Sequence, residues 1–367
     1  MKLVFAIKRL ENAAGGAERV LCLVCSALAA RGHGVTVVSF DRPGGASFYR
    51  LDERVRWIQL AIGDTQRTAR FTETVHRMFA LRRTVAGIRP DVVVAFMHSM
   101  FVPAAFALAG TRIPLIGSEH IVPEHYRSRP LQWALLNMAA PVLAGMTVLS
   151  EAVRAQYPTW IGRRMTVMPN PVAGAPPGTD VEANEREPLI LNVGRLDPQK
   201  DQATLVQAFV QVAKEFPDWR LRIVGEGTLR PELQQLVEQL GLAPKVSLPG
   251  LVREIDAEYR RAGIFAMPSR YESFGLATAE AMAHGLPVVG FDDCPGTNEL
   301  VTDGETGILV RGNGDRSEAM AGGLRKLMSD RERRQAYGRA GRSQARRMFD
   351  LDSVCDRWEQ LLCQVRA

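Results

Sequence analysis

Short β-branched runs alternate with helical patterns along almost the whole chain of 367 residues. Strands that pair in parallel need a crossover connection, usually a helix, so this alternation predicts parallel sheets covered by helices. The expected strands are, in chain order, 3–7, 35–40, 55–60, 91–96, 114–118, 146–149, 165–168, 189–193, 220–224, 245–248, 263–267, 287–291 and 307–310. The fold class is therefore predicted to be α/β.

The series of strands is interrupted once, which divides the chain. A chain of this length exceeds most single cores and suits two domains. Pro169, Pro171 and the turn-rich residues 174–177 are followed by the polar stretch 182–187, a composition typical of a linker. We predict a first domain at 1–172, a linker at 173–187, a second domain at 188–350 and a C-terminal helix at 351–367.

Composition excludes several classes of protein. Hydrophobic residues make up 46% and charged residues 23%, as in soluble globular proteins. A net charge of +6 permits an anionic partner but does not choose one. The five cysteines are odd in number and scattered, which favours a reducing compartment over a disulfide framework. Cys22 and Cys25 lie in an apolar helical pattern, and we expect them to be buried by packing rather than to bind metal.

No segment reads as a leader or a membrane span. The apolar start ends too early, at Lys8 and Arg9, to form a signal peptide. The most apolar window, 131–149, is broken by Asn137, Pro141 and Gly145. It predicts a buried helix running into a strand. We therefore expect a cytoplasmic protein.

The stretch from Met267 to Gly290 carries the most concentrated chemistry. It reads as a strand end, a tight loop and a helix from about Gly275, with Glu272 and Glu280 eight positions apart. A helix N-terminus after such a loop can hold an anion on backbone N–H groups, while carboxylates bind hydroxyl groups.

Five motifs follow predicted strands: GGAER at 15–19, GRLDPQKD at 194–201, IVGEG at 223–227, PSRYESFGLATAE at 268–280 and PGTNELV at 295–301. Together they resemble family 4 of the retaining glycosyltransferases. Each motif is weak alone, but their order covers nearly the whole chain. The resemblance implies the GT-B fold, in which two Rossmann-like domains face each other across a cleft and the second holds a nucleotide-sugar.

The resemblance also implies roles for charged residues of the second domain. Arg195 and Lys200, in the loop opened by Gly194, would clamp the donor diphosphate and stabilise it as it leaves. Glu272 would contact hydroxyls of the donor sugar. Glu280 would accept hydrogen bonds from the two ribose hydroxyls; the alternative is an exposed acid at a helix N-terminus.

Backbone groups would complete the donor site. The N–H groups of Phe274, Gly275 and Leu276 would approach the sugar and phosphate, because glycine removes the side chain that would block them. Leu251 and its neighbours would meet the nucleobase. Gly225 and Gly227 are expected to be turn residues, and Glu299 to support the site.

In the first domain, Gly15 and Gly16 match the family's glycine loop. The alternative is a simple turn into a helix. His120, after the strand 114–118, stands where this family often has a histidine in the sugar pocket, and it is the fourth predicted catalytic residue beside Arg195, Lys200 and Glu272. Relatives often carry His-Asp at this point, whereas this chain carries Glu119-His120, so the pair's role stays open. His98 ends another strand and is either functional or structural.

The resemblance implies a retaining transfer without an enzymic nucleophile. The leaving diphosphate would help to deprotonate the acceptor hydroxyl on the same face of the sugar. No metal site and no cofactor are expected, because the nucleotide-sugar is itself a co-substrate. The N-terminal half looks similar to bacterial transferases that extend glycans on polyprenyl diphosphates, which favours a UDP-sugar such as UDP-GalNAc or UDP-GlcNAc. A GDP-mannose-using mannosyltransferase, a nucleotide-sugar epimerase and a silent binding protein are the alternatives.

The expected acceptor is a lipid-linked or other glycan, and two patterns bear on membranes. A helix is predicted from Thr65 to Arg89, with an apolar stripe and many arginines. Such a helix either lies on an anionic membrane or packs on its own domain. We expect peripheral binding at the inner face of the cytoplasmic membrane. The arginine-rich tail after 330 is interleaved with acids, and nucleic-acid binding is not expected.

Overall fold

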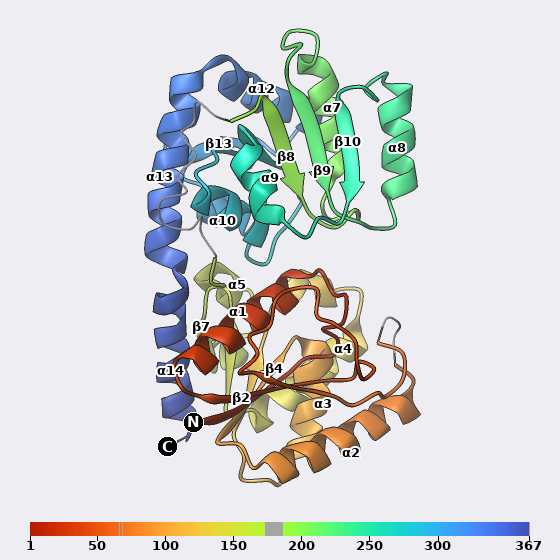
Figure 1. The fold of residues 1–367 in the computed structure, drawn as a ribbon, viewed down its shortest axis with the longest axis vertical. Helices are drawn as coiled ribbons and strands as arrows, with labels where there is room; N and C mark the ends of the chain where they lie inside the picture. Colours follow the sequence, from red (N-terminus) through yellow and green to blue (C-terminus); the bar gives the residue numbers. More distant parts are fainter. Residues whose placement is uncertain (66, 68, 173–185, 367) are drawn as a thin grey trace. The chain divides into compact units, whose positions relative to one another are not determined.

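The computed structural model describes residues 1–65, 67, 69–172 and 186–366, which form two compact units (Figure 1). The first unit contains Met1–Pro171 and the C-terminal segment from Leu351 onward, and the second contains Val172–Asp350. The boundary between the units, after Pro171, lies one residue before the predicted end of the first domain at 172. The predicted linker, 173–187, lies outside the described residues except for Arg186 and Glu187.

The first unit is built on a parallel seven-stranded sheet in the order β3-β2-β1-β4-β5-β6-β7. Its strands are β1 (Lys2–Ala6), β2 (Gly34–Ser39), β3 (Arg56–Gln59), β4 (Val92–Phe96), β5 (Leu115–Ser118), β6 (Gly145–Val148) and β7 (Met165–Val167). Its helices are α1 (Gly16–Ala30), α2 (Phe71–Ile88), α3 (His98–Leu108), α4 (Pro130–Ala139), α5 (Glu151–Ala155), α6 (Thr159–Gly162) and α14 (Leu351–Arg366), with 3-10 turns η1 (Pro123–Tyr126) and η2 (Ala140–Val142).

The second unit repeats the architecture with a parallel six-stranded sheet in the order β10-β9-β8-β11-β12-β13. Its strands are β8 (Leu189–Val193), β9 (Arg220–Val224), β10 (Val246–Gly250), β11 (Ile264–Met267), β12 (Val288–Phe291) and β13 (Gly307–Val310). Its helices are α7 (Gln202–Val212), α8 (Arg230–Gln239), α9 (Ile255–Arg261), α10 (Leu276–Ala283), α11 (Thr297–Leu300), α12 (Arg316–Ser329) and α13 (Arg331–Phe349). The prediction of two parallel α/β units is confirmed.

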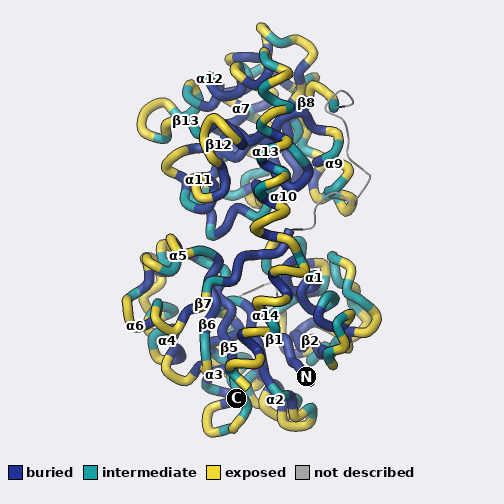
Figure 2. Tube along the Cα trace, turned by 90° about the vertical axis from the view of Figure 1, so that its left-hand side faces the viewer, coloured by how far each residue is buried: buried dark blue, intermediate teal, exposed yellow. Residues whose placement is uncertain are grey.

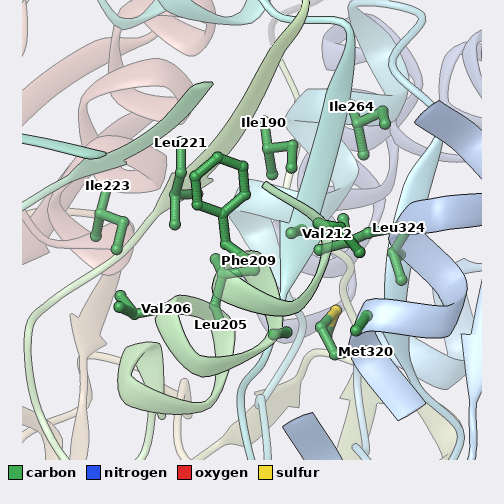
Figure 3. Close-up of a cluster of buried hydrophobic side chains, with 14 of the residues drawn as sticks. Ile190, Leu205, Val206, Phe209, Val212, Leu221, Ile223, Ile264, Met320 and Leu324 are labelled. Atoms are coloured by element: carbon green, nitrogen blue, oxygen red, sulfur yellow. The ribbon is translucent and has the colours of Figure 1, made fainter. Parts of the chain in front are cut away.

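The core of the second unit lies between its sheet and the neighbouring helices α7 and α12 (Figure 3). Strand side chains meet helix side chains there, and the labelled members are Ile190, Leu205, Val206, Phe209, Val212, Leu221, Ile223, Ile264, Met320 and Leu324. Figure 2 shows strands such as β12 as buried and the outer turns of α13 as exposed. Burial of this apolar surface stabilises the sheet whose strand ends carry the predicted site.

The C-terminal helix α14 belongs to the first unit, where it packs beside α1. The indole of Trp358, 2% exposed, lies 6.3 Å from the ring of Phe5 on β1 and 6.3 Å from that of Phe96 on β4. At the end of α1, Arg31 pairs with Asp352 and Glu359 of α14. The chain therefore completes its first core only with its last residues.

Helix α2 corrects the prediction for residues 65–89. It begins at Phe71, after Arg70 in an extended conformation, and not at Thr65. The predicted apolar stripe turns mostly inward, with Leu81 and Val85 buried. Arg77, one of the arginines of this segment, is 5% exposed and pairs with Glu73. The stripe thus packs on its own domain. The outer face of α2 instead exposes Phe71 (83%) and Phe79 (69%).

The apolar window 131–149 is also less buried than predicted. It forms α4, η2 and β6, but Leu131 and Met138 on α4 are 72% and 61% exposed. Within the described residues, no helix has the length and apolar character needed to cross a membrane. The free thiols of Cys22 and Cys25 are both buried in α1, as the packing interpretation requires.

Candidate functional site

An ion pair between two strand-end loops marks the candidate site of the second unit. Lys200 precedes α7 after β8, and Glu272 precedes α10 after β11. These strands are neighbours in the sheet, so their carboxyl ends meet. The Lys200 Nζ lies 2.6 and 2.8 Å from the two carboxylate oxygens of Glu272, and the side chains are only 16% and 8% exposed. A cation and an acid are thus held together at one edge of the sheet.

The loop of Gly194 and Arg195 lies next to this pair. Gly194 lies against the stem of Lys200, where a Cβ would be 3.5 Å from Cδ. The Arg195 side chain is 69% exposed and pairs with Asp197 at 3.1 Å. Arg195 and Lys200 therefore share a loop but have different partners, and the structure does not show them as a clamp.

Gly225 explains why this loop can lie so close to the next one. Gly225 has a φ of 146°, and any Cβ there would overlap the carbonyl oxygen of Gly194. Gly227 faces the Leu196 carbonyl in the same way. Both glycines are turn residues whose missing side chains allow the loops after β8 and β9 to pack together.

The loop after β12 supports Glu272 from behind. The Glu272 N–H donates to the Pro295 carbonyl at 2.9 Å, and a Cβ on Gly296 would lie 2.8 Å from the Glu272 Cβ. The Glu299 carboxylate accepts the Gly296 N–H at 3.3 Å. Glu299 therefore holds the turn on which Glu272 rests, which agrees with its predicted supporting place.

The N-terminus of α10 carries backbone N–H groups for which the described residues provide no acceptor. Gly275 adopts a φ of 79°, which favours glycine, and precedes Leu276. Within the described part of the chain, the N–H groups of Phe274, Gly275 and Leu276 donate to no protein acceptor. The Phe274 ring is buried and lies 5.1 Å from that of Phe349. The backbone here presents donors in the arrangement that binds anions.

Glu280 is buried, so the interpretation as an exposed helix acid is wrong. Its side chain is among the least accessible acids, with the residue 4% exposed. The Tyr259 hydroxyl donates to Glu280 Oε2 at 2.9 Å, and the Tyr259 ring stacks on His284 at 5.1 Å. Tyr259, from α9, was missed by sequence reasoning because nothing local links it to Glu280. Leu251, just after β10, is 51% exposed.

The first unit presents its predicted residues at the ends of β1, β4 and β5. Gly15 caps α1 with an extended backbone (φ −89°) that any residue adopts, but a Cβ there would overlap the Glu18 carboxylate. Gly16 begins α1 and is exposed. His98 begins α3 after Met97, whose φ of 69° is unusual for a residue with a side chain. Burial lowers the pKa of His98 to about 4.

Two side chains, Ser118 and Phe96, contact the His120 ring. The Ser118 hydroxyl lies 3.0 Å from His120 Nε2, and the ring stacks on Phe96 at 4.9 Å. Removal from solvent lowers the His120 pKa to about 4, so the imidazole is neutral at pH 7. Tyr126 is buried and donates a hydrogen bond from its hydroxyl to Glu119. His120, Gly15 and Gly16 belong to the first unit, and the other predicted site residues to the second.

No three His, Cys, Asp or Glu side chains of the described chain gather where they could hold an ion.

Two family models cover most of the chain between them. The model described as Glycosyltransferase Family 4 matches residues 14–173, and that described as Glycosyl transferases group 1 matches residues 179–344. The chain belongs to the GT-B glycosyltransferases of the family 4 type. This glycosyltransferase therefore carries the Lys200–Glu272 pair in the part matched by the group 1 model.

Curated relatives of this glycosyltransferase differ in length and substrate. An α-1,4-N-acetylgalactosaminyltransferase of Campylobacter jejuni, whose name specifies a GalNAc-containing undecaprenol diphosphate acceptor, is 26% identical and covers 100% of this chain and 99% of its own. An exopolysaccharide phosphotransferase of Streptomyces coelicolor is 28% identical over 96% of this chain, which spans 39% of that protein. A GDP-mannose-dependent mannosyltransferase of Mycolicibacterium smegmatis is 29% identical over 65% of this chain and 69% of its own.

Solved structures agree with the fold. Sucrose-phosphate synthase of Thermosynechococcus elongatus superposes with a TM-score of 0.84 at 21% identity, covering 100% of this chain and 99% of its own. The HepE protein of Anabaena, solved with UDP and glucose, has a TM-score of 0.77 at 21% identity, covering 99% of this chain and 100% of its own. The predicted GT-B fold class is confirmed.

Proposed function

We propose that this glycosyltransferase moves a hexose or N-acetylhexosamine from a UDP-sugar to a hydroxyl of a lipid-linked glycan or polysaccharide precursor. The transfer retains the anomeric configuration and needs no metal. One observation carries the proposal: Lys200 Nζ, a partner for a diphosphate, lies 2.6 Å from Glu272, a partner for sugar hydroxyls. A nucleotide-sugar has both groups next to each other.

In this proposal the donor takes the place of Glu272 as the partner of Lys200. The diphosphate accepts from Lys200, from the N–H groups of Phe274, Gly275 and Leu276, and from Arg195, which is exposed and can turn from Asp197. Glu272, released from the lysine, accepts hydrogen bonds from hydroxyls of the transferred sugar.

The nucleoside lies beyond the diphosphate. Glu280, held by Tyr259, accepts from the ribose hydroxyls. Leu251, half exposed after β10, packs on the base. Gly15 and Gly16 let the first unit's backbone approach the donor phosphate or the acceptor, and His120 contacts the sugar as a neutral imidazole.

The proposed chemistry takes place on one face of the sugar. The bond between the anomeric carbon and the diphosphate oxygen breaks, and a bond to the acceptor oxygen forms on the same face. The acceptor proton passes to the departing diphosphate, whose negative charge Lys200 and Arg195 offset. No carboxylate is assigned as a nucleophile.

The substrates are proposed from the relatives. UDP is bound in the Anabaena structure, and the Campylobacter relative is named for an undecaprenol-linked acceptor. A second candidate is a GDP-mannose donor, because the mycobacterial relative uses it. Polyprenyl carriers reside in membranes, so we propose peripheral binding at the inner face of the cytoplasmic membrane. The outer face of α2, with Phe71, Phe79 and the exposed Arg70 and Arg83, is the proposed contact.

A panel of nucleotide-sugars tests the proposal. UDP-sugars and GDP-mannose are incubated with a membrane lipid extract in the presence and absence of a chelator, and the product anomer is assigned by NMR. Transfer from a UDP-sugar with retained configuration in the chelator supports the proposal. Inverted product, dependence on a metal, or a changed sugar without acceptor rejects it, the last outcome favouring an epimerase.

A further inference from the structure

Glu119, at the end of β5, is a buried carboxylate to which the proposed function gives no role. The residue is 1% exposed. Burying a carboxylate is costly unless hydrogen bonds replace water. It immediately precedes His120 in the chain.

Three neutral donors surround this carboxylate. The N–H groups of His120 and Ile121 donate to Glu119 Oε1 at 3.0 and 3.2 Å, and the Tyr126 hydroxyl donates to Oε2 at 2.7 Å. Tyr157, from the segment after α5, donates its hydroxyl to the Ile121 carbonyl at 3.0 Å. Together these contacts fix both the start of the segment 120–126 and the 3-10 turn that ends it.

The His120 ring is held independently of Glu119. Its Nε2 lies 3.0 Å from Ser118 Oγ, which in turn lies 2.9 Å from the Thr147 hydroxyl. Phe96 stacks on the ring. The ring's direction therefore depends on the backbone that carries it, and Glu119 holds that backbone.

We infer that Glu119 is a positioning residue, which fixes the backbone of His120 and Ile121 and the Tyr126 hydroxyl so that His120 meets the transferred sugar in one orientation. The inference rests on the proposed function for the role of His120. Glu119 itself, almost wholly buried, touches neither donor nor acceptor.

The electrostatics agree with this geometry. Burial raises the pKa of Glu119 to about 7, while the donated hydrogen bonds from Tyr126, Ile121 and His120 oppose the shift. Both carboxyl oxygens accept hydrogen bonds from these donors, and protonation changes the charge that the donors face. The segment 120–126 is thus ordered by a group that a proton can alter.

Kinetics of single and double variants test the inference. Glu119→Gln keeps an oxygen for the two N–H groups but turns an N–H₂ group toward Tyr126. We expect its transfer kcat to fall at least tenfold, with the Kd for UDP and the Tm close to wild type. Tyr126→Phe removes one hydrogen-bond donor to Glu119, and its transfer kcat should fall severalfold. This variant keeps the inference testable if Glu119→Gln folds poorly. Glu124→Gln, in the exposed Arg127–Glu124 pair of the same segment, is the matched control.

Coupling to His120 separates positioning from general stability. Because Glu119 acts through His120, Glu119→Gln combined with His120→Ala should transfer no more slowly than His120→Ala alone. Losses that multiply overturn the inference, as does a Glu119→Gln variant with wild-type kcat.

Amide hydrogen exchange tests the same hydrogen bonds independently of sugar transfer. The N–H groups of His120 and Ile121 should exchange at least tenfold faster in Glu119→Gln than in wild type. Their exchange rates in Glu124→Gln should equal those in wild type. Equal exchange in all three proteins overturns the inference. If the wild-type protein transfers no sugar while Glu119→Gln still shows faster exchange than wild type, the proposed function is rejected and Glu119 remains the residue that orders the segment.

Discussion

The Lys200 ammonium lies between the two carboxylate oxygens of Glu272, at 2.6 and 2.8 Å, although the residues are 72 positions apart in the chain. Both side chains are largely buried. Without a donor, Lys200, the proposed partner of the diphosphate, and Glu272, the proposed partner of the sugar, neutralise each other's charge. A donor must therefore break this pair in order to bind, and removal of either partner leaves a buried charge without compensation.

Glu272→Gln should reveal this competition. The variant loses the acid that holds Lys200, so we expect a lower Tm than wild type and a larger rise in Tm when UDP is added. Transfer should fall by about 100-fold, since the contact to the sugar is lost. Thermal unfolding with and without UDP measures the first two effects, and an initial-rate assay the third. Glu226→Gln, in the exposed Arg230 pair, is the control. A smaller UDP effect in Glu272→Gln than in wild type would contradict the prediction.

Glu280→Ala should instead weaken nucleotide binding itself. Loss of a charged acceptor for the ribose hydroxyls is expected to raise the Kd for UDP about 10- to 100-fold. Tyr259→Phe, which removes only the hydrogen bond to Glu280, should raise it about two- to tenfold. Isothermal titration calorimetry measures both. An equal loss of UDP affinity in Glu272→Gln and Glu280→Ala would sink the division of roles.

Stability should depend on pH through Glu119. Its pKa of about 7 lies above the ordinary value of 4.5, so the folded state binds this proton more tightly than the unfolded state. The stabilising contribution is complete below about pH 4.5 and is lost as the pH rises through 7. Relative to Glu119→Gln, the wild type should lose on the order of 3 kcal/mol between these limits.

Urea unfolding of both proteins from pH 5 to 8 measures that difference. Tyr126 and Tyr157 stay protonated, because burial raises the pKa of both well above this range. His98 and His120 stay neutral, with pKa values of about 4. His125, which touches Tyr126, is present in both proteins and cancels. Parallel stability curves would show that Glu119 does not titrate here.

Membrane binding should depend on the outer face of α2. Phe71→Ser with Phe79→Ser removes two exposed aromatic rings without touching the core, so sedimentation with anionic vesicles at low salt should fall while Tm is unchanged. Leu131→Ser with Met138→Ser, on the exposed side of α4, is the matched comparison. If the α2 double variant still binds vesicles and the α4 double variant does not, the membrane contact lies on α4 and the prediction is wrong.

Trp358→Ala should destabilise the first unit. The indole packs against the rings of Phe5 and Phe96, and its removal is expected to cost about 3–5 kcal/mol. Trp160→Ala, at a position 45% exposed, should have a small effect. Denaturant unfolding followed by circular dichroism compares them. Similar losses in the two variants would show that α14 does not complete the core.

Much of the fold could be predicted from the local pattern of hydrophobic and turn residues. β8, β9 and β13 have the predicted bounds, because β-branched runs there are bordered by turn residues. Helix α2 was placed six residues too early. The sequence 65–70 contains no large apolar residue, and the Lys8 ammonium donates a hydrogen bond to the Arg67 carbonyl. Arg77 was misjudged because its Glu73 partner and the acceptor carbonyl of Ile62 compensate for burial.

The sequence by itself determined two α/β units and a set of loops rich in glycine and charge, since hydrophobic periodicity and turn residues act over a few positions. Only the tertiary structure decided which charges meet. The strand order sets β11 beside β8 and so joins Glu272 to Lys200. Packing also brings the Tyr259 hydroxyl to Glu280 and the Tyr126 hydroxyl to Glu119. These partners lie far apart along the chain or on other elements, and packing alone brings them within hydrogen-bond distance.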